Sequence, residues 1–196
     1  MDFITYAVPF FLLAILVELA YGIAIKKNTY RLNDAISNLF MGTLRTANKL
    51  IIIGAAGYVF YSVETHFALW RMDGTSAATW IFAFIIYDFF YYWFHRISHE
   101  RQIFWASHAA HHQSEDYNLS TALRQTGTGA FVSWVFYIPM FVIGIPSYVF
   151  ISVASLNLIY QFWVHSEHIP KLGWYENYFV TASNHRVHHA QNEQYI

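Results

Sequence analysis

Long apolar stretches alternate with short polar ones along most of this chain. The first, residues 4–25, is long enough to cross about 30 Å of hydrocarbon as a helix, and it ends in Lys26, Lys27 and Arg31. A signal peptide carries its positive charge before the apolar run, so this stretch is predicted to be a retained membrane span. Glu18 lies inside it, where ionisable residues usually face other helices, and either a structural partner or a place near substrate would explain it.

The following stretches predict an interfacial helix and further spans. Residues 31–49 mix charged and apolar side chains, as in an amphipathic helix at a membrane surface. Residues 50–69 form a second apolar run, and residues 75–94 form a third that is rich in aromatic side chains. Residues 126–164 supply two shorter runs joined by a turn signal at residues 144–146. The pattern predicts an all-α, multi-pass membrane helical bundle with about four to five apolar spans.

Composition agrees with one membrane domain. Hydrophobic residues make up 56% of the chain and charged residues 12%, whereas soluble domains carry roughly 25% charged residues. A length of 196 residues fits a single domain, residues 1–196, with a catalytic region predicted over about residues 84–196. The chain stops at QNEQYI with no closing element, which predicts that the native protein continues beyond Ile196.

Net charge and cysteine usage exclude several classes of function. The net charge is −1, so no attraction to nucleic acid is expected. The chain has no cysteine, which excludes disulfides, thiolate ligands and iron–sulfur clusters. Any metal ion must therefore be held by imidazole and carboxylate groups.

Histidines provide the strongest chemical signal. The chain has 11 of them, and most form clusters spaced H-x-x-x-H or H-x-x-H-H near the ends of apolar runs. Residues i, i+3 and i+4 share one helix face, so each cluster is predicted to direct its imidazoles at a single point. Eight or nine clustered histidines are too many for one ion and about right for two, because one ion is usually satisfied by four ligands. The clusters are His95 and His99; His108, His111 and His112; His165, with His168; and His185, His188 and His189.

Two histidines are weaker candidates for metal ligands. His168, three residues after His165, is interpreted equally well as a second ligand or as an interfacial residue. His66 stands alone near the end of the second apolar run, which Glu64 and His66 interrupt, and it is expected to be a surface residue.

Charge asymmetry predicts the side of the membrane that the clusters face. Basic residues placed after the first span mark the cytoplasmic side by the positive-inside rule. The third span then returns the chain to that side, and the hairpin of residues 126–164 goes out and back. All clusters are expected to meet at the cytoplasmic face of a bacterial inner membrane or of the endoplasmic reticulum. The basic residues are Lys26, Lys27, Arg31, Arg45 and Lys49, against Arg71 alone in the next loop.

The histidine boxes resemble those of the fatty acid hydroxylase and sterol desaturase superfamily of membrane di-iron oxygenases. The segments DFFYYWFHRISHE, SHAAHHQSEDYNLSTALRQ, LIYQFWVHSEH and NHRVHH are most similar to its alkylglycerol monooxygenase branch, over roughly the half of the chain from Asp88 to His189. The resemblance implies two iron ions, O2 as co-substrate, and hydroxylation of an ether lipid beside the ether oxygen. It implies metal ligation by His95, His99, His108, His111, His112, His165, His185, His188 and His189.

The resemblance also marks polar residues and two departures. Glu100 follows the first box, where the branch has an acidic residue, and it could bind or tune the metal or orient a histidine. The other residues in the family's signature segments have two interpretations: helix capping and salt bridging at the membrane surface, or a direct part in catalysis. His168 replaces a residue that is often apolar in the family, and the chain ends before the family's usual final segment. The other marked residues are Asp88, Asn118, Thr121 and Arg124.

Together these features predict an integral-membrane, O2-dependent monooxygenase that hydroxylates the acyl or alkyl chain of a lipid. Electrons would come from a reduced pterin, as the branch implies, or from an electron-transfer partner protein. Motif spacing does not separate hydroxylation from desaturation, so a lipid or sterol desaturase is an alternative. A His-rich metal transporter is the alternative from another class, and transporter ligands would lie along a path at membrane depth. Here they follow the ends of spans, which favours the enzyme.

Overall fold

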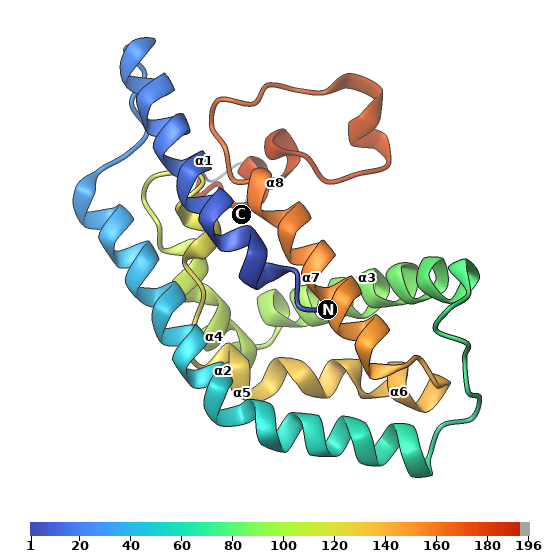
Figure 1. Ribbon diagram of the computed structural model, residues 1–196. Coiled ribbons are helices and arrows are strands. Elements are labelled where there is room, and N and C mark those ends of the chain that lie inside the picture. Colours follow the sequence, from blue (N-terminus) through green and yellow to red (C-terminus); the bar gives the residue numbers. More distant parts are fainter. Residues whose placement is uncertain (193–196) are drawn as a thin grey trace.

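The structure, a computed structural model, describes residues 1–192. Every element in this part is helical, which confirms the all-α prediction (Figure 1). The α-helices are α1 (Ile4–Ala24), α2 (Leu32–His66), α3 (Ala77–Glu100), α4 (Gln102–His112), α5 (Gly129–Val132), α6 (Ile138–Ile143), α7 (Ser147–Trp163) and α8 (Ala182–His188). Short 3-10 helices are η1 (Thr121–Leu123), η2 (Ser133–Tyr137) and η3 (Gly173–Asn177).

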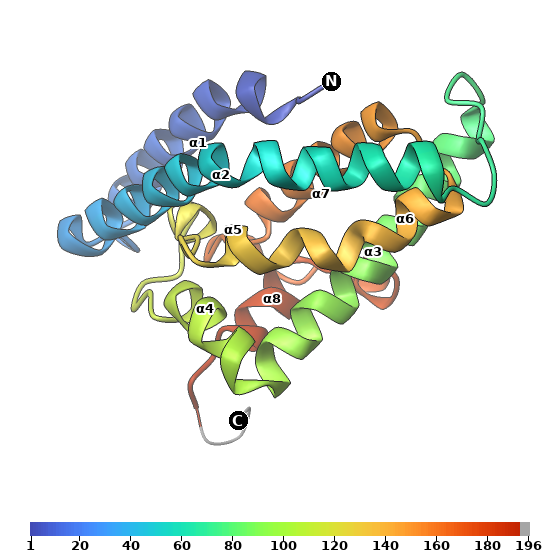
Figure 2. The same ribbon diagram turned by 90° about the horizontal axis from the view of Figure 1, so that it is seen from below.

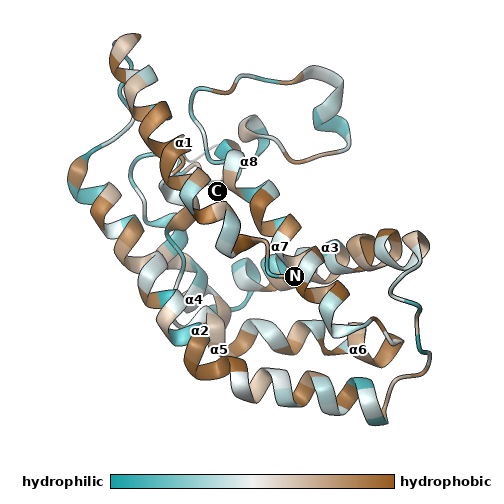
Figure 3. Cartoon of the chain, in the orientation of Figure 1, coloured by the Kyte–Doolittle hydropathy of each residue, from teal (hydrophilic) through white to brown (hydrophobic). Residues whose placement is uncertain are grey.

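Three of these helices, α1, α2 and α3, are long and apolar enough to cross a membrane, judged by length and composition. Most of α1 is brown in Figure 3, and most of its large apolar side chains are exposed. Large apolar faces of this kind need a covering, and a lipid bilayer provides one. The remaining apolar segments, residues 129–143 and α7, are shorter than a span. The described residues therefore contain three helices of span length, fewer than the four to five spans that were predicted.

The helices run between two ends of the bundle. At one end, the loop after α2 meets the α6–α7 turn, where Leu69 N–H donates to the carbonyl of Val142 at 2.8 Å. At the other end, Lys27 pairs with Glu167 at 3.4 Å and Arg31 pairs with Asp116 at 3.0 Å. The histidine clusters lie at this second end, together with Lys27 and Arg31.

Helix α2 differs from the prediction, which placed a break between an interfacial helix and a span near Leu50. The structure has one continuous helix of 35 residues. No proline interrupts it, and the change from mixed to apolar side chains alters what surrounds the helix without removing any backbone hydrogen bond. At 1.5 Å per residue it is about 50 Å long, more than the hydrocarbon core requires.

The predicted turn at residues 144–146 is confirmed. Helix α6 ends at Ile143, and Gly144 has φ 99°, a left-handed conformation that glycine adopts without a Cβ clash. A Cβ at this position would also lie 1.8 Å from the carbonyl oxygen of Trp70. Figure 2 shows α5 and α6 between α2 and α3. The main apolar core lies among these helices and α7, and consists of Ala83, Tyr87, Tyr137, Met140, Phe141, Ile145, Val149 and Val153.

Candidate metal centre

The clustered histidines come from four segments that meet at one end of the bundle. Helix α3 ends at Glu100, and extended backbone at Arg101 turns the chain directly into α4. His165 follows α7, and α8 brings the last box back to the same place. A capping box between Thr181 and Asn184 begins α8, which satisfies its free backbone N–H groups and fixes its direction. The site is therefore built on helix ends rather than on long loops.

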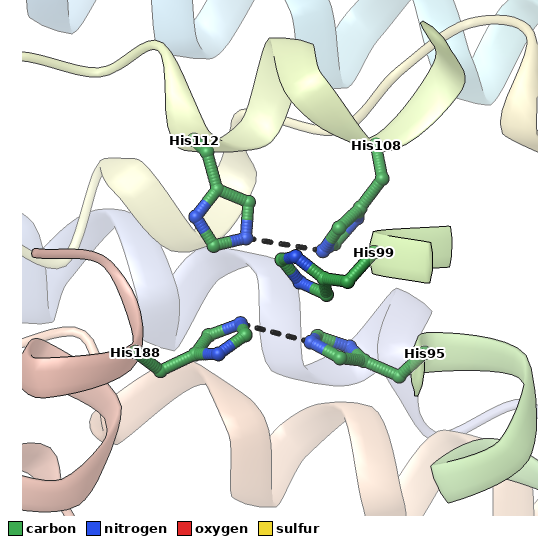
Figure 4. A group of neighbouring side chains, drawn as sticks. All are labelled: His95, His99, His108, His112 and His188. Carbon is green, nitrogen blue, oxygen red and sulfur yellow. Dashed lines mark hydrogen bonds between the residues drawn. The ribbon is translucent and has the colours of Figure 1, made fainter. Parts of the chain in front are cut away.

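Nine imidazoles form two groups, and within each group the ligand nitrogens lie within 4.8 Å of one another. The groups adjoin, since the rings of His112 and His189 are stacked with centroids 4.2 Å apart. Figure 4 shows the first group, whose side chains from α3, α4 and α8 point toward one another. The first group is His95, His99, His108, His112 and His188, and the second is His111, His165, His185 and His189.

The prediction that each cluster points at a single place was wrong for both H-x-x-H-H boxes. In α4, His108 and His112 belong to the first group and His111 to the second. In α8, His188 belongs to the first group, while the other two histidines of its box belong to the second. Residues four apart stay on one helix face, but consecutive residues are about 100° apart around the axis. Each adjacent His-His pair therefore serves both groups.

Distances between the imidazole nitrogens fit metal ligation. The Nε2 atoms of His95 and His188 are 2.9 Å apart, and those of His108 and His112 are 3.1 Å apart. In the second group, Nε2 of His165 lies 2.9 Å from Nε2 of His185. Two nitrogens bound to one ion at about 2.0–2.1 Å lie about 3 Å apart when they meet at a right angle. The ring positions are those of ligands around a common centre.

Hydrogen bonds on the far side of the rings fix which nitrogen is free. Nδ1 of His111 donates to the carbonyl of Arg124 at 3.0 Å, and Nδ1 of His165 donates to the carbonyl of Gln161 at 2.8 Å. A carbonyl only accepts, so Nδ1 carries the proton and Nε2 keeps its lone pair in a neutral ring. The Nε2 atoms of His111 and His165 face each other at 3.3 Å. Two lone pairs at that distance repel unless a cation lies between them, so this donor set suits a metal ion.

The family follows from comparison with known proteins. The model of the family described as fatty acid hydroxylase matches residues 80–196. The chain belongs to this family. An alkylglycerol monooxygenase from Homo sapiens is 41% identical over 198 residues, which cover 100% of this chain and 44% of that protein. The alkylglycerol monooxygenase from Xenopus tropicalis is 39% identical, and the match covers 97% of this chain and 43% of that protein. The one from Caenorhabditis elegans is 33% identical, and the match covers 85% of this chain and 33% of that protein.

This fatty acid hydroxylase family member thus lies on the branch of the alkylglycerol monooxygenases, and spans less than half the length of these relatives. No solved structure matches it. Family membership and three apolar helices of span length together identify an integral membrane protein. The resemblance drawn from the histidine boxes is confirmed.

Asp88 lies at the end of a hydrogen-bonded chain that begins at a histidine of the first group. His95 Nδ1 is 3.3 Å from the hydroxyl of Tyr91, which donates to Oε1 of Gln161 at 2.6 Å. The Gln161 amide donates to Asn157, whose Nδ2 lies 3.4 Å from Asp88 Oδ1. Because the Tyr91 proton points to Gln161, its oxygen accepts from His95 Nδ1–H, which leaves His95 Nε2 free for the group.

Of the other marked polar residues, Asn118 and Thr121 hold backbone in place, whereas Glu100 does not. Glu100 is exposed and pairs with Arg96 at 2.7 Å, outside both groups. Asn118 Nδ2 donates to the carbonyl of Thr29 at 2.7 Å, and Thr121 Oγ1 donates to the carbonyl of Asp116 at 2.9 Å. These bonds tie the segment after α4 to the α1–α2 loop and to itself.

Arg124 supports the second group through its backbone. Its Nε donates to the carbonyl of Ala110 at 2.6 Å, and its Nη1 donates to Asn38 at 3.0 Å. The same Nη1 lies 3.6 Å from the carboxylate of Asp34 on α2. With its side chain held in this way, the Arg124 carbonyl is positioned to accept from His111. Asn38, Tyr91 and Gln161 were missed in the sequence, although Tyr91 and Gln161 each precede a clustered histidine by one helical turn.

Histidines 66 and 168 lie outside both groups. His66 is the exposed last residue of α2, as expected for a surface residue. His168 packs beside α1, with its ring edge-on to Tyr21 at a centroid distance of 5.2 Å. His168 is therefore not part of either group of imidazoles, and its ring packs against α1.

Burial keeps the clustered imidazoles outside the spans uncharged at neutral pH. It lowers the pKa of His111 to about 3, and the pKa values of His165 and His188 each to about 4, from an ordinary value of 6.5. Neighbouring histidines lower these values further, because a second positive charge nearby disfavours protonation. Neutral imidazole is the form that binds a metal ion.

These depressed pKa values predict acid sensitivity of the metal-free protein. Between pH 6.5 and about pH 3 the unfolded chain binds a proton at His111 that the folded protein does not. The free energy of unfolding therefore falls as the pH falls through this window, by about 2 kcal/mol at pH 5 for this residue alone. Thermal unfolding of chelator-treated protein in detergent at pH 7.5 and pH 5 measures the effect. His66→Ala should show the same loss, and an unchanged unfolding temperature at pH 5 would contradict the burial of these rings as neutral groups.

Proposed function

We propose that this protein is a di-iron lipid monooxygenase that hydroxylates an alkyl chain beside an ether oxygen. The relatives are named alkylglycerol monooxygenases, which supports an alkyl lipid as substrate, and the resemblance of the histidine boxes implies the two irons and the position. The observation that carries the proposal is the pair of adjoining histidine groups with their ligand nitrogens converging. Imidazole suits iron, and five and four ligands fit two ions. Bound iron would supply the chemistry that reduces O2 and cleaves a C–H bond of the alkyl chain.

The chain's own residues bind the metal ions and orient the histidine rings. In this proposal the nine histidines are the metal ligands. Tyr91 orients His95, and it is itself held by a hydrogen-bonded chain that passes through Gln161 and ends at Asp88. The backbone carbonyl of Arg124 orients His111. Partners of this kind typically account for 10–100-fold in metal affinity or activity. Asp88, Asn118 and Arg124 then act by positioning helices and rings, whereas Glu100 pairs with Arg96 at the exposed end of α3.

The electron donor and the membrane orientation are parts of the same proposal. Insertion of one oxygen atom from O2 leaves the second as water, which requires two electrons and two protons from outside the lipid. A reduced pterin or a redox partner protein would supply the electrons. The histidine end, with its basic loop of Lys26, Lys27 and Arg31, would face the cytoplasm, because positive loops stay on that side.

A lipid oxidation assay tests the proposal. Full-length protein is loaded with iron in detergent or lipid discs and incubated with O2, a reduced pterin and a long-chain monoalkylglycerol. A hydroxyl on the carbon beside the ether oxygen makes a hemiacetal, which splits into a fatty aldehyde and glycerol. Appearance of the aldehyde, dependent on both iron and O2, is the expected result. An alkene product would indicate a desaturase instead, and no lipid-dependent O2 uptake, with metal moving across the membrane, would indicate a transporter.

A further inference from the structure

The segment between α7 and α8 presents a patch of exposed aromatic and apolar side chains, and we call residues 169–180 the aromatic loop. Figure 1 shows this loop extending away from α7 before it returns to α8. Trp174 is 72% exposed and Tyr178 is 77% exposed, and Phe179 and Val180 are about half exposed. A contiguous patch of this kind on a protein surface usually marks a contact with another molecule or with a membrane.

The rings of the aromatic loop are packed against one another. Tyr175 and Phe179 stack with centroids 4.6 Å apart, and Trp174 lies edge-on to Tyr175 at 6.1 Å and to Tyr178 at 6.4 Å. The loop therefore presents its outer rings as a preformed surface. Little side-chain entropy remains to be lost when such a surface meets a partner.

Hydrogen bonds attach the aromatic loop to both neighbouring helices. On α7, the Tyr160 hydroxyl donates to the Val180 carbonyl at 2.8 Å. In η3, Glu176 accepts from Thr181 Oγ1 at 2.7 Å and from Ser183 Oγ. Thr181 is the N-cap of α8, and Ser183 lies in the first turn of that helix. The loop is thus bonded directly to the helix that carries the last histidine box.

The aromatic loop lies beside α7 and not beyond its end. Tyr160, which holds Val180, precedes His165 by more than one helical turn. Leu156 lies one turn further from His165 on the same face of α7 and is 43% exposed. The exposed apolar face of α7 therefore leads directly to the loop. In an integral membrane protein the bilayer covers the sides of the helical bundle, so the loop lies where that covering ends.

The chemistry of the aromatic loop fits the headgroup layer of a bilayer. Trp and Tyr join an apolar ring to an N–H or O–H group, and they are enriched where hydrocarbon meets water. An irregular backbone exposed to lipid does not occur in the hydrocarbon core, which excludes a deeper position. Lys171 is exposed, while the Glu176 carboxylate is turned toward α8. The loop therefore offers a positive charge to lipid phosphates.

We propose that the aromatic loop is inserted in the headgroup layer of the bilayer, at the end of the bundle that carries the histidine groups. The partner is a lipid surface and not another protein. Through Glu176 the inserted loop holds α8 and the last histidine box at the membrane surface. This placement rests on the membrane character of the chain and does not depend on the reaction that it catalyses.

Fluorescence quenching tests the depth of the aromatic loop. The chain has no cysteine, so Tyr178→Cys offers one site for a bimane label in the full protein, in discs of phosphatidylcholine and phosphatidylserine. Glu115→Cys, in the segment after α4, is the reference for water, because its side chain is 74% exposed. Phospholipids brominated near the headgroup end of the chain should quench the loop label about twofold more than the reference, and aqueous iodide about twofold less, as for a group about 5–10 Å below the surface.

A second reference separates the outcomes. Leu16→Cys, 62% exposed in the span α1, reports a label that lipid covers. Iodide quenching of the loop label as strong as that of Glu115→Cys would place the loop in water. Protection of the loop label from both quenchers, while Leu16→Cys is quenched by brominated lipid, would show that protein covers it. Either result would overturn the proposal.

Two exposed tryptophans provide matched variants. Trp174 is 72% exposed in the loop, and Trp70 is 63% exposed at the opposite end of the bundle. A carboxylate on the loop should draw it out of the bilayer, because burial of an unpaired charge is costly. Trp174→Glu should therefore raise the iodide quenching of the Tyr178→Cys label to that of Glu115→Cys, whereas Trp70→Glu should leave it low. An unchanged label depth in Trp174→Glu, or equal effects of the two changes, would contradict the proposal.

Discussion

His111→Ala is expected to lower the iron content from two ions per chain to about one, and to reduce lipid hydroxylation by more than about a hundredfold. His111 is buried, its Nε2 faces that of His165 at 3.3 Å, and its Nδ1 is fixed by the Arg124 carbonyl. Loss of a partner that merely orients a ligand costs 10–100-fold, and loss of the ligand itself should cost more. Iron per chain is measured by elemental analysis, and turnover by aldehyde release.

The same measurements on controls make the result specific. His66→Ala replaces an exposed histidine at the end of α2 and should change neither iron content nor turnover. Both variants should remain in the membrane fraction, because His111 lies in α4 and His66 is the exposed last residue of α2, so neither change removes an apolar side chain from a span. Normal hydroxylation by His111→Ala would show that the second group is not a metal site.

Arg124→Ala is expected to destabilise the fold by about 3–5 kcal/mol, the usual cost of removing one partner of a buried ion pair. The Arg124 and Asp34 side chains are only 14% and 10% exposed, and the guanidinium also bonds Asn38 and the Ala110 carbonyl. Its removal leaves the Asp34 charge without its cation and frees the carbonyl that orients His111. A lower unfolding temperature in detergent should therefore be accompanied by weaker iron binding.

Arg96→Ala is the matched control for this variant. Arg96 also pairs with a carboxylate, that of Glu100, but the two side chains are 48% and 51% exposed. Exposed pairs contribute about 0–1 kcal/mol, so this variant should unfold close to the wild-type temperature and keep its iron. Equal destabilisation by the two substitutions would contradict the claim that the buried contacts of Arg124 stabilise the fold.

Much of the architecture could be predicted because its signals are local. The length of the apolar runs predicted α1 and α3, and the glycine and proline after Ile143 predicted the turn between α6 and α7. The histidine boxes could be found because helical spacing of four residues keeps two rings on one face, as with His95 and His99. The continuity of α2 was missed because a change in polarity at Leu50 resembles a boundary, although the backbone has no reason to break there.

Other features depend on contacts that no local pattern encodes. Whether His111 joins the ring set of His108 or that of His165 depends on where α7 and α8 lie, far away in sequence. The acceptors that fix His111 and His165 are backbone carbonyls, which every residue has, so no residue type reveals them. Glu18 could be recognised as unusual, but its donors on Tyr30, Leu119 and Ser166 could not.

The most direct measurement is a diffraction map of the iron-loaded protein at the iron absorption edge. The account predicts two anomalous peaks, one among His95, His99, His108, His112 and His188, and one among His111, His165, His185 and His189. A single peak shared by both groups, or iron bound away from these rings, would contradict it.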